Sequence, residues 1–290
     1  MFAIRPGRPT QRADVHLIRA ERRAFPGPAR HRPDTAAYLA DLAEPYGVQP
    51  RSCAPGHSYG EMGRALLDAV VPDQEPVDLL VLAFSIHDTW PGRATATYLS
   101  HCCPGTPLSF AICDQGCAAA FSGLRIVRDY LGTAGCRRAL LFVVEQAVLP
   151  YDSPVPAPEQ HRGVAMVFGS DDADRGPRLT AVRQHAGVPA DAAADLVAAD
   201  LTELQAGHVV LGDALAAAWP QPRRDGVTVV PPGQPTTGVW WRLVDALTAD
   251  GADPVVAADY DPGLGYLCLA GFAEDALDQL GEPTTEQGYG

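Results

Sequence analysis

The chain has 290 residues, of which 47% are hydrophobic, and this is enough to bury a sizeable core. All 22 basic residues are arginine, so no lysine is present for a phosphate-binding P-loop, a pyridoxal-phosphate Schiff base or general-base catalysis. The net charge of −13 argues against nucleic acid as a partner, because neutralising phosphates requires a basic face.

The charge is unevenly distributed along the chain. Residues 1–32 contain eight arginines and two acidic residues, whereas ten acidic residues and no basic residue follow Arg242. The basic segment is a candidate docking site for an acidic partner, with a solvated terminus as the simpler alternative. No apolar run approaches the roughly 20 residues that a bilayer-spanning helix needs, so we expect a cytoplasmic protein with no membrane partner.

The first part of the chain predicts an alternation of helices and apolar strands. A short strand over residues 15–18 and a helix over 35–43 precede a helix over 59–71 and a continuous apolar strand over 78–84. A helix over 94–99, a strand over 108–112, a helix over 121–131 and strands over 139–144 and 164–168 follow. This alternation is typical of a layered α/β sheet.

The second part repeats this order in shorter form. We expect helices over residues 193–204, 209–219 and 240–247, and strands over 227–230, 255–258 and 266–270. Two similar halves are therefore predicted, with residues 1–170 forming the N-terminal half and 171–290 a shortened C-terminal half.

Cys117 is the strongest candidate for a reactive side chain. Seven cysteines are present, with no CxxC pair and no zinc-type spacing, so we expect reduced thiols and no metal site. Cys117 follows a predicted strand and Gly116, and it precedes the small residues 118–120 that begin a helix. A thiol at a helix N-terminus is expected to have a lowered pKa and to be nucleophilic. A buried, inert cysteine is the alternative.

Several segments resemble the ketosynthase III family of the thiolase superfamily. They are the strand VDLLVLAFS, the strand and cysteine loop of residues 110–118, the helix FSGLRIVRDYL, the strand LLFVVEQ and the closing turn DPVVAADYDPGLGY. The resemblance implies a thiolase-like α/β fold with two related halves in a five-layered α-β-α-β-α arrangement. It also implies an enzyme that transfers an acyl group from coenzyme A or an acyl carrier protein thioester onto Cys117, without a tightly bound cofactor.

In this family, a histidine at a helix start and an asparagine in a Gly-Asn loop donate hydrogen bonds to the thioester oxygen. The matching positions here are His208, before the predicted helix over residues 209–219, and Gln234, which replaces the asparagine. Each such donor can contribute about 3 kcal/mol where negative charge develops. His161 and Arg162 are candidates for contacting a coenzyme A or phosphopantetheine phosphate.

The sequence also departs from the family pattern. Pro262 stands in the closing turn where a glycine N–H can help to bind an oxyanion, and proline has no N–H. The segment between Gly169 and His208 is short, which predicts an open acyl pocket or one that a partner completes. The family forms dimers through the strand before the nucleophile, so the resemblance implies a homodimer or heterodimer through residues 108–112.

Three functions remain open from the sequence. The first is acyl transfer or condensation at Cys117, in fatty-acid-like, polyketide or other secondary-metabolite biosynthesis. The second is a degenerate, non-catalytic subunit that completes a ketosynthase partner.

The third is a hydrolase, because Gly56-His57-Ser58-Tyr59-Gly60 fits the nucleophile motif GxSxG, but no strand precedes it. We interpret Ser58 instead as a helix N-cap with Glu61 at the third helical position. His87 and His101 are candidates for lining the pocket.

Overall fold

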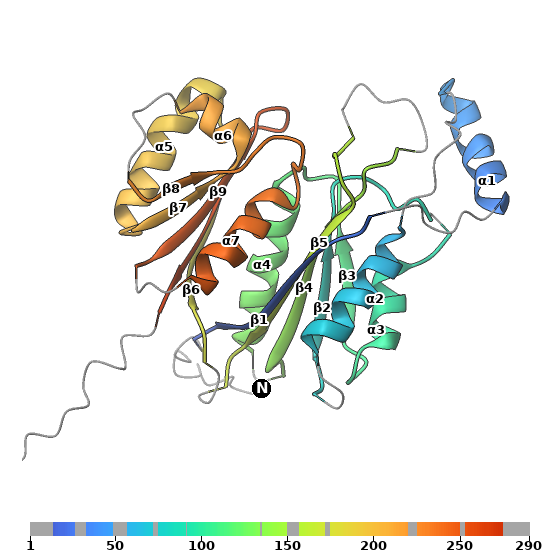
Figure 1. Ribbon diagram of the computed structural model, residues 1–290, viewed down its shortest axis with the longest axis horizontal. Coiled ribbons are helices and arrows are strands. Elements are labelled where there is room, and N and C mark those ends of the chain that lie inside the picture. The colour runs from blue at the N-terminus through green and yellow to red at the C-terminus, as the bar shows by residue number, and fades with distance from the viewer. Residues whose placement is uncertain are drawn as a thin grey trace, which may run out of the picture.

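A computed structural model provides the structure, and it describes residues 14–26, 33–48, 57–71, 75–90, 92–133, 135–149, 157–171, 175–219, 225–249 and 253–274. Its elements form layers of helices and sheet (Figure 1). In chain order they are β1 (His16–Ala24), α1 (Pro33–Ala43), the 3-10 helix η1 (Glu44–Tyr46), α2 (Tyr59–Val70), β2 (Leu79–Ala83), α3 (Thr95–Cys102), β3 (Leu108–Ile112), α4 (Ala118–Leu131), β4 (Arg138–Glu145), β5 (Arg162–Gly169), β6 (Arg178–His185), α5 (Ala190–Glu203), β7 (His208–Leu211), α6 (Asp213–Ala218), β8 (Val227–Val229), α7 (Gly238–Thr248), β9 (Val255–Asp261) and β10 (Tyr266–Ala273).

The strands confirm that the protein consists of two related halves. Their order across the sheet is β3-β2-β4-β5-β1-β6-β10-β9-β7-β8, and only the pair His16–Arg178 joins β1 to β6. Counted from its own first strand, each set of five has the order 3-2-4-5-1. In each set the second strand pairs in parallel with the third and fourth, and the remaining pairs are antiparallel.

The buried apolar residues form three clusters, which fill the spaces between five layers. The helices α2 and α3 cover the outer face of the first half, and α5 and α6 cover the outer face of the second. Between the two halves lie α4 and α7, which pack on the inner faces of both sets of strands. This is the α-β-α-β-α arrangement that the resemblance implied (Figure 1).

Both central helices begin at the same end of the molecule, the upper end in Figure 1. The rings of Phe121 in α4 and Trp240 in α7 lie 4.7 Å apart, so the first turns of these helices are in contact. The loops that precede both helices are therefore held at one end of the central layer.

Two predictions about secondary structure were wrong. The predicted helix over residues 209–219 is in fact strand β7 followed by the short helix α6, because Val209, Val210 and Leu211 pair with β8 and β9 inside the sheet. Strand β6 was not predicted, because its polar residues mask an alternating pattern. No helix in the described part of the chain is long and apolar enough to cross a membrane.

Candidate active site around Cys117

Cys117 lies at the N-terminal end of α4, as predicted, and is its N-cap residue. The loop that leads to it from β3 turns sharply, with φ of +59° at Asp114 and +52° at Gly116. Glycine adopts such a left-handed conformation without a steric penalty, which explains Gly116. Cys117 is only 8% exposed.

The electrostatic environment of Cys117 differs from our expectation. Burial raises the pKa of this thiol well above its ordinary value, and the negative charges of Asp259, Cys268 and Asp261 raise it further. The backbone N–H of Cys117 itself lowers the pKa by a smaller amount. The expectation of a lowered pKa was wrong because desolvation and acidic neighbours outweigh the helix N-terminus.

Of the two aspartates on the inner face of β9, Asp261 approaches the cysteine loop and Asp259 approaches the loop after β7. A Cβ atom on Gly116 would clash with Oδ2 of Asp261, and a Cβ atom on Gly212 would clash with Oδ1 of Asp259. Burial, followed by the charges of Asp213, Asp261 and Glu145, raises the pKa of Asp259 to about 8, while a hydrogen bond from the backbone N–H of Tyr260 opposes the shift. The site is therefore acidic rather than basic.

Glu145, the last residue of β4, ties the first half of the protein to the start of α7. Its buried carboxylate accepts hydrogen bonds from the backbone N–H groups of Thr236 (2.9 Å) and Thr237 (3.2 Å), and from the hydroxyl of Thr237. Burial raises its pKa to about 7, and these hydrogen bonds limit the shift. The carboxylate thus fixes the loop that contains Gln234.

Gln234 lies in the predicted loop before α7 and is 7% exposed. Its Nε2 donates to the backbone oxygen of Gly233 at 2.6 Å, and its Oε1 is buried without a hydrogen-bond partner in the described part of the chain. Its loop and the cysteine loop lie at the same end of the central layer, because α4 and α7 both begin there (Figure 1).

His208 does not open a helix, contrary to our expectation. It is the first residue of β7, pairs with Val255, and lies 3.2 Å from the hydroxyl of Thr228. Asp261, which approaches the cysteine loop, is six residues further along β9, or about 20 Å at 3.3 Å per residue. The structure therefore does not bring His208 to Cys117, and the helix that follows β7 begins instead at Asp213.

The closing turn between β9 and β10 uses its own backbone donors. The N–H groups of Gly263 and Leu264 both bond to Oδ1 of Asp261 at 3.0 Å, and that of Gly265 bonds to the Asp261 carbonyl oxygen at 2.8 Å. Pro262 has no N–H. These four residues thus leave no free backbone donor for an oxyanion.

His161 and Arg162 lie where β5 begins. The Nδ1 atom of His161 accepts the N–H of Ala147 at 3.2 Å, and burial lowers the pKa of the ring. The guanidinium of Arg162 lies 4.8 Å above the Trp241 ring and bonds to Gln160. Arg162 also pairs with Glu145 across β4 and β5, so it is near the loop at the start of α7.

Ser58 is a helix cap, as predicted. Its hydroxyl accepts the N–H of Glu61, and the Glu61 carboxylate accepts the N–H of Ser58, which completes a capping box. The side chain is 3% exposed. These contacts give Ser58 a structural role at the start of α2.

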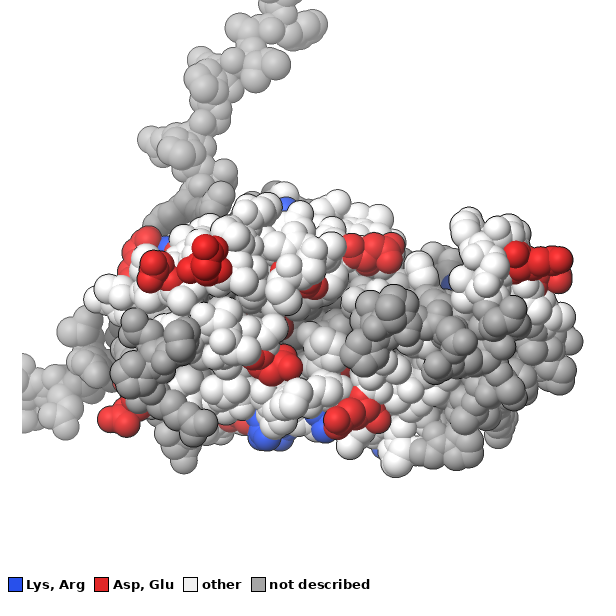
Figure 2. Space-filling model, turned by 90° about the horizontal axis from the view of Figure 1, so that it is seen from above, with Lys and Arg blue, Asp and Glu red and all other residues white. Residues whose placement is uncertain are grey.

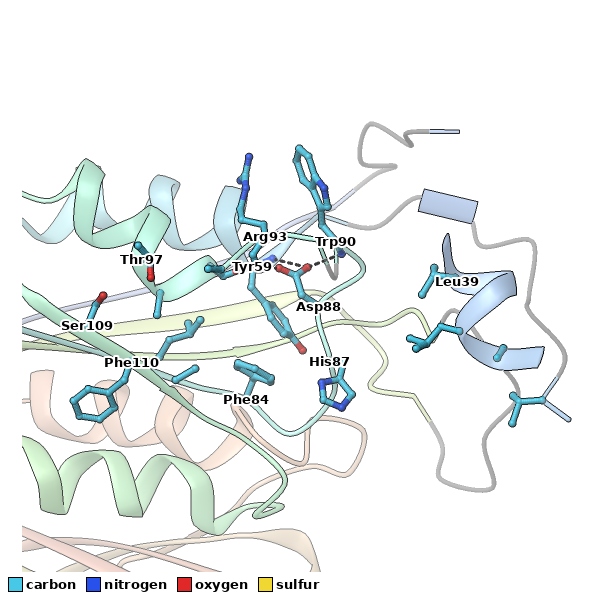
Figure 3. Close-up of a pocket in the computed structure, with 18 of the residues that line it drawn as sticks. Leu39, Tyr59, Phe84, His87, Asp88, Trp90, Arg93, Thr97, Ser109 and Phe110 are labelled. Atoms are coloured by element: carbon cyan, nitrogen blue, oxygen red, sulfur yellow. Dashed lines mark hydrogen bonds between the residues drawn. The ribbon is translucent and has the colours of Figure 1, made fainter. Parts of the chain in front are cut away.

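A separate cavity of about 740 Å³ lies beside β3, the edge strand of the sheet (Figure 3). Residues of α1, of the loop after β2 and of α3 and β3 line it, and they include His87. Asp88 at its rim is held by the N–H groups of Tyr59 and Trp90. His101 lines a shallower hollow next to it. Cys117 does not line the cavity.

No protein-family model matches the sequence, and no curated protein matches it significantly. Among solved structures, ChlB3, described as an acyltransferase, is 18% identical, with 90% of this chain and 98% of ChlB3 covered and a TM-score of 0.63. AbyA1, a tetronic acid condensing enzyme, is 18% identical over 89% and 99% of the chains, with a TM-score of 0.62.

OleA of Xanthomonas campestris in its acetamide-bound form is 14% identical, with 90% of this chain and 99% of OleA covered and a TM-score of 0.65. The protein has the thiolase-like fold that the ketosynthase III resemblance implied, so the expectation about the fold is confirmed.

The acidic residues of this site were not predicted from the sequence. Asp259 and Asp261 lie in the strand VVAADYD, whose alternating positions 255, 257, 259 and 261 share the inner face. The signal in the sequence that could have identified them is an acidic residue at an inward-facing position of an otherwise apolar strand. Glu145 gave a similar signal, because it ends a strand of buried residues.

Proposed function

We propose that this protein is an acyltransferase of the ketosynthase III type that forms an acyl-cysteine at Cys117. The Cys117 sulfur attacks the carbonyl carbon of an acyl-coenzyme A or acyl carrier protein thioester, and the carrier thiol leaves. The acyl group then passes to a carbon, oxygen or nitrogen nucleophile. The observation that carries the proposal is the position of Cys117, at the N-terminus of the central helix α4 and in the loop that meets Asp261 of the second half.

The printed descriptions of the structural neighbours support this reaction class. ChlB3 is described as an acyltransferase and AbyA1 as a condensing enzyme. Acyl transfer and condensation share the first step, formation of an acyl-enzyme. The proposal therefore does not depend on which acceptor follows.

The charge of the protein surface affects how an acyl carrier would approach the Cys117 site. Seen from above, where α4 and α7 begin, the described surface shows acidic side chains in several places and few basic ones (Figure 2). A phosphate or an acidic carrier protein gains little from such a surface. We therefore keep the arginine-rich N-terminal segment as the proposed docking element for an acyl carrier protein; apart from residues 14–26 it lies outside the described residues. Arg162, with His161, stays a candidate phosphate contact.

We further propose that the protein forms a dimer through β3. This edge strand exposes backbone N–H and C=O groups, and Leu108 is 55% exposed. Unpaired edge strands favour pairing with another chain. The large cavity borders the same edge, so a second subunit would cover part of it.

A second function has support from the same site. The acidic surroundings of Cys117, the raised pKa of its thiol and the bonded amides of the closing turn all favour a non-catalytic subunit of a heterodimeric ketosynthase III-like complex. Cys117 at the start of α4 is the observation against it.

One experiment separates these functions. The purified protein is incubated with a panel of acyl-coenzyme A and acyl carrier protein thioesters, and its intact mass is measured. The acyltransferase proposal predicts a mass increase by the acyl group that Cys117→Ala abolishes and Cys136→Ala, which changes another buried cysteine, retains. No adduct with any donor, alone or with a ketosynthase partner, would support the non-catalytic subunit.

A further inference from the structure

The residue before Cys117 is held against β9. Asp261 lies so close to Gly116 that no Cβ atom fits between them. Asp259 is two residues earlier on the same strand and therefore points to the same face. Among the neighbouring charges, that of Asp259 has the largest effect on the Cys117 thiol, and it raises the pKa of this thiol.

The residue after Cys117 is held from the other side. The backbone oxygen of Ala118 accepts a hydrogen bond from Nε2 of Gln184 at 3.4 Å, and the same nitrogen lies 3.9 Å from the sulfur of Cys268. Cys268 is the direct partner of Asp259 across β10 and β9. Gln184 and Cys268 therefore link the backbone of Ala118 to the position beside Asp259 in the sheet.

The Asp259 carboxylate has one oxygen that is open to a further hydrogen bond. It is 6% exposed and lies against the backbone of Gly212. Within the described part of the chain, the one hydrogen bond that it accepts joins the N–H of Tyr260 to Oδ1 at 2.9 Å. The second oxygen, Oδ2, has no such bond and is available for a further partner.

We propose that Asp259 is the proton acceptor for the Cys117 thiol in acyl-enzyme formation. The proposal rests on the proposed function and deepens it. The proton moves from the Cys117 sulfur to the Asp259 carboxylate as the sulfur attacks the thioester carbonyl carbon. When the tetrahedral intermediate collapses, the bond to the carrier sulfur breaks and Asp259 returns the proton to that sulfur. No electrons are gained or lost overall.

The groups around Asp259 suit this role. Burial, followed by the charges of Asp213 from α6, Asp261 from β9 and Glu145 from β4, raises its pKa to about 8. The charge of Asp259 in turn raises the pKa of the Cys117 and Cys268 thiols, and Arg125 of α4 is the basic group that acts on Cys268. An acceptor that titrates near the working pH combines a useful carboxylate fraction with useful basicity.

Alkylation of Cys117 by iodoacetamide tests this inference without an acyl donor. The rate is measured between pH 6 and 9.5 by peptide mass spectrometry, which separates Cys117 from the other cysteines. A proton acceptor with a pKa near 8 predicts a rate that rises through pH 8 and then levels. A rate that climbs about tenfold per pH unit up to pH 9.5 would show that only the free thiolate reacts and would overturn the proposal.

Asp259→Asn provides a second test, because loss of the proton acceptor and loss of a negative charge change the alkylation rate in opposite directions. Loss of the proton acceptor predicts Cys117 alkylation at least tenfold slower at pH 8, with Asp259→Glu restoring part of the rate. Removal of a negative charge alone predicts faster alkylation, because it lowers the pKa of the thiol. Asp261→Asn is the matched control for charge and should accelerate the reaction. Unchanged or faster alkylation in Asp259→Asn would refute the assignment.

Circular dichroism of each variant checks that it is folded, and the wild-type pH profile needs no variant. Because iodoacetamide is not a thioester, the test stands apart from the proposed function. A missing acyl adduct with an intact Asp259 dependence would refute acyl transfer alone. A normal acyl adduct without that dependence would refute only the role of Asp259.

Discussion

Gly116 and Asp261 lie in direct contact, and the carboxylate of Asp261 occupies the space that any side chain at position 116 would need. The contact joins the cysteine loop of the first half to the closing turn of the second. Together with the left-handed φ of +52° at Gly116, this contact explains why the residue before Cys117 is glycine.

Gly116→Ala is therefore expected to destabilise the protein. The left-handed conformation alone costs a non-glycine residue about 1–2 kcal/mol, and the clash with Asp261 adds to it. We expect the free energy of unfolding, measured by urea denaturation, to fall by about 2 kcal/mol or more. Gly135→Ala is the matched control, because its surroundings are open and no loss is expected. Equal stability of the two variants would contradict the contact.

The two buried carboxyl groups predict how stability depends on pH. The pKa of Glu145 is raised to about 7 and that of Asp259 to about 8, so the folded state binds these protons more tightly than the unfolded state. Between the ordinary value and the raised pKa, unfolding releases a proton, and the free energy of unfolding falls as pH rises. Each group contributes a slope of up to about 1.4 kcal/mol per pH unit.

Urea denaturation at pH 5, 6, 7 and 8 measures this slope. We expect the wild-type protein to lose stability over the whole range, with the contribution of Glu145 ending near pH 7 and that of Asp259 near pH 8. Asp259→Asn should flatten the curve, most clearly between pH 7 and 8. Stability that rises with pH in the wild type would show that these carboxyl groups are not buried as described.

Local patterns in the sequence were sufficient for the cysteine loop and most strands. The cysteine loop is one continuous segment that consists of a strand, Gly116, Cys117 and a run of small residues. Its geometry depends on neighbours in the chain. The stretch HVVL of β7 is short and apolar, so its pattern suits a helix or a strand equally well. Only its pairing with β8 and β9 decides the outcome.

The acidic part of the site depends on contacts between distant residues. An aspartate in a strand is normally interpreted as facing solvent, and Asp259 is buried only because β10 and the loop at Gly212 enclose it. Glu145 acquires its role from Thr237, 92 residues away. Spacing in the sequence contains no information about either contact.

The position of His208 leads to a further prediction. Because it begins β7 and pairs with Val255, it is far from the residues that approach Cys117. His208→Gln should leave the rate of Cys117 acylation within about twofold of wild type, whereas loss of a transition-state hydrogen bond would reduce it about 100-fold or more. Single-turnover acylation, followed by intact mass, distinguishes the two. A 100-fold loss in the folded variant would restore His208 as a catalytic residue.

Substitution at the edge of the sheet tests the dimer. Leu108 is 55% exposed on β3, so Leu108→Asp should leave the fold intact but place a charge in the proposed interface. We expect the molar mass from light scattering to change from dimer to monomer. Val229→Asp is the matched control, because Val229 is 42% exposed on β8, the opposite edge strand, and should leave the mass unchanged. A wild-type monomer would contradict the interface.

The central claim is that Cys117 accepts an acyl group. The direct measurement is mass spectrometry of peptides from protein that has been incubated with acyl thioesters and digested at low pH to preserve thioester bonds. We predict the acyl group on the peptide that contains Cys117, and on none of Cys103, Cys136 and Cys268, the other buried cysteines whose thiols have raised pKa values. An unmodified Cys117 with every donor, or an acyl group on another residue, would contradict the claim.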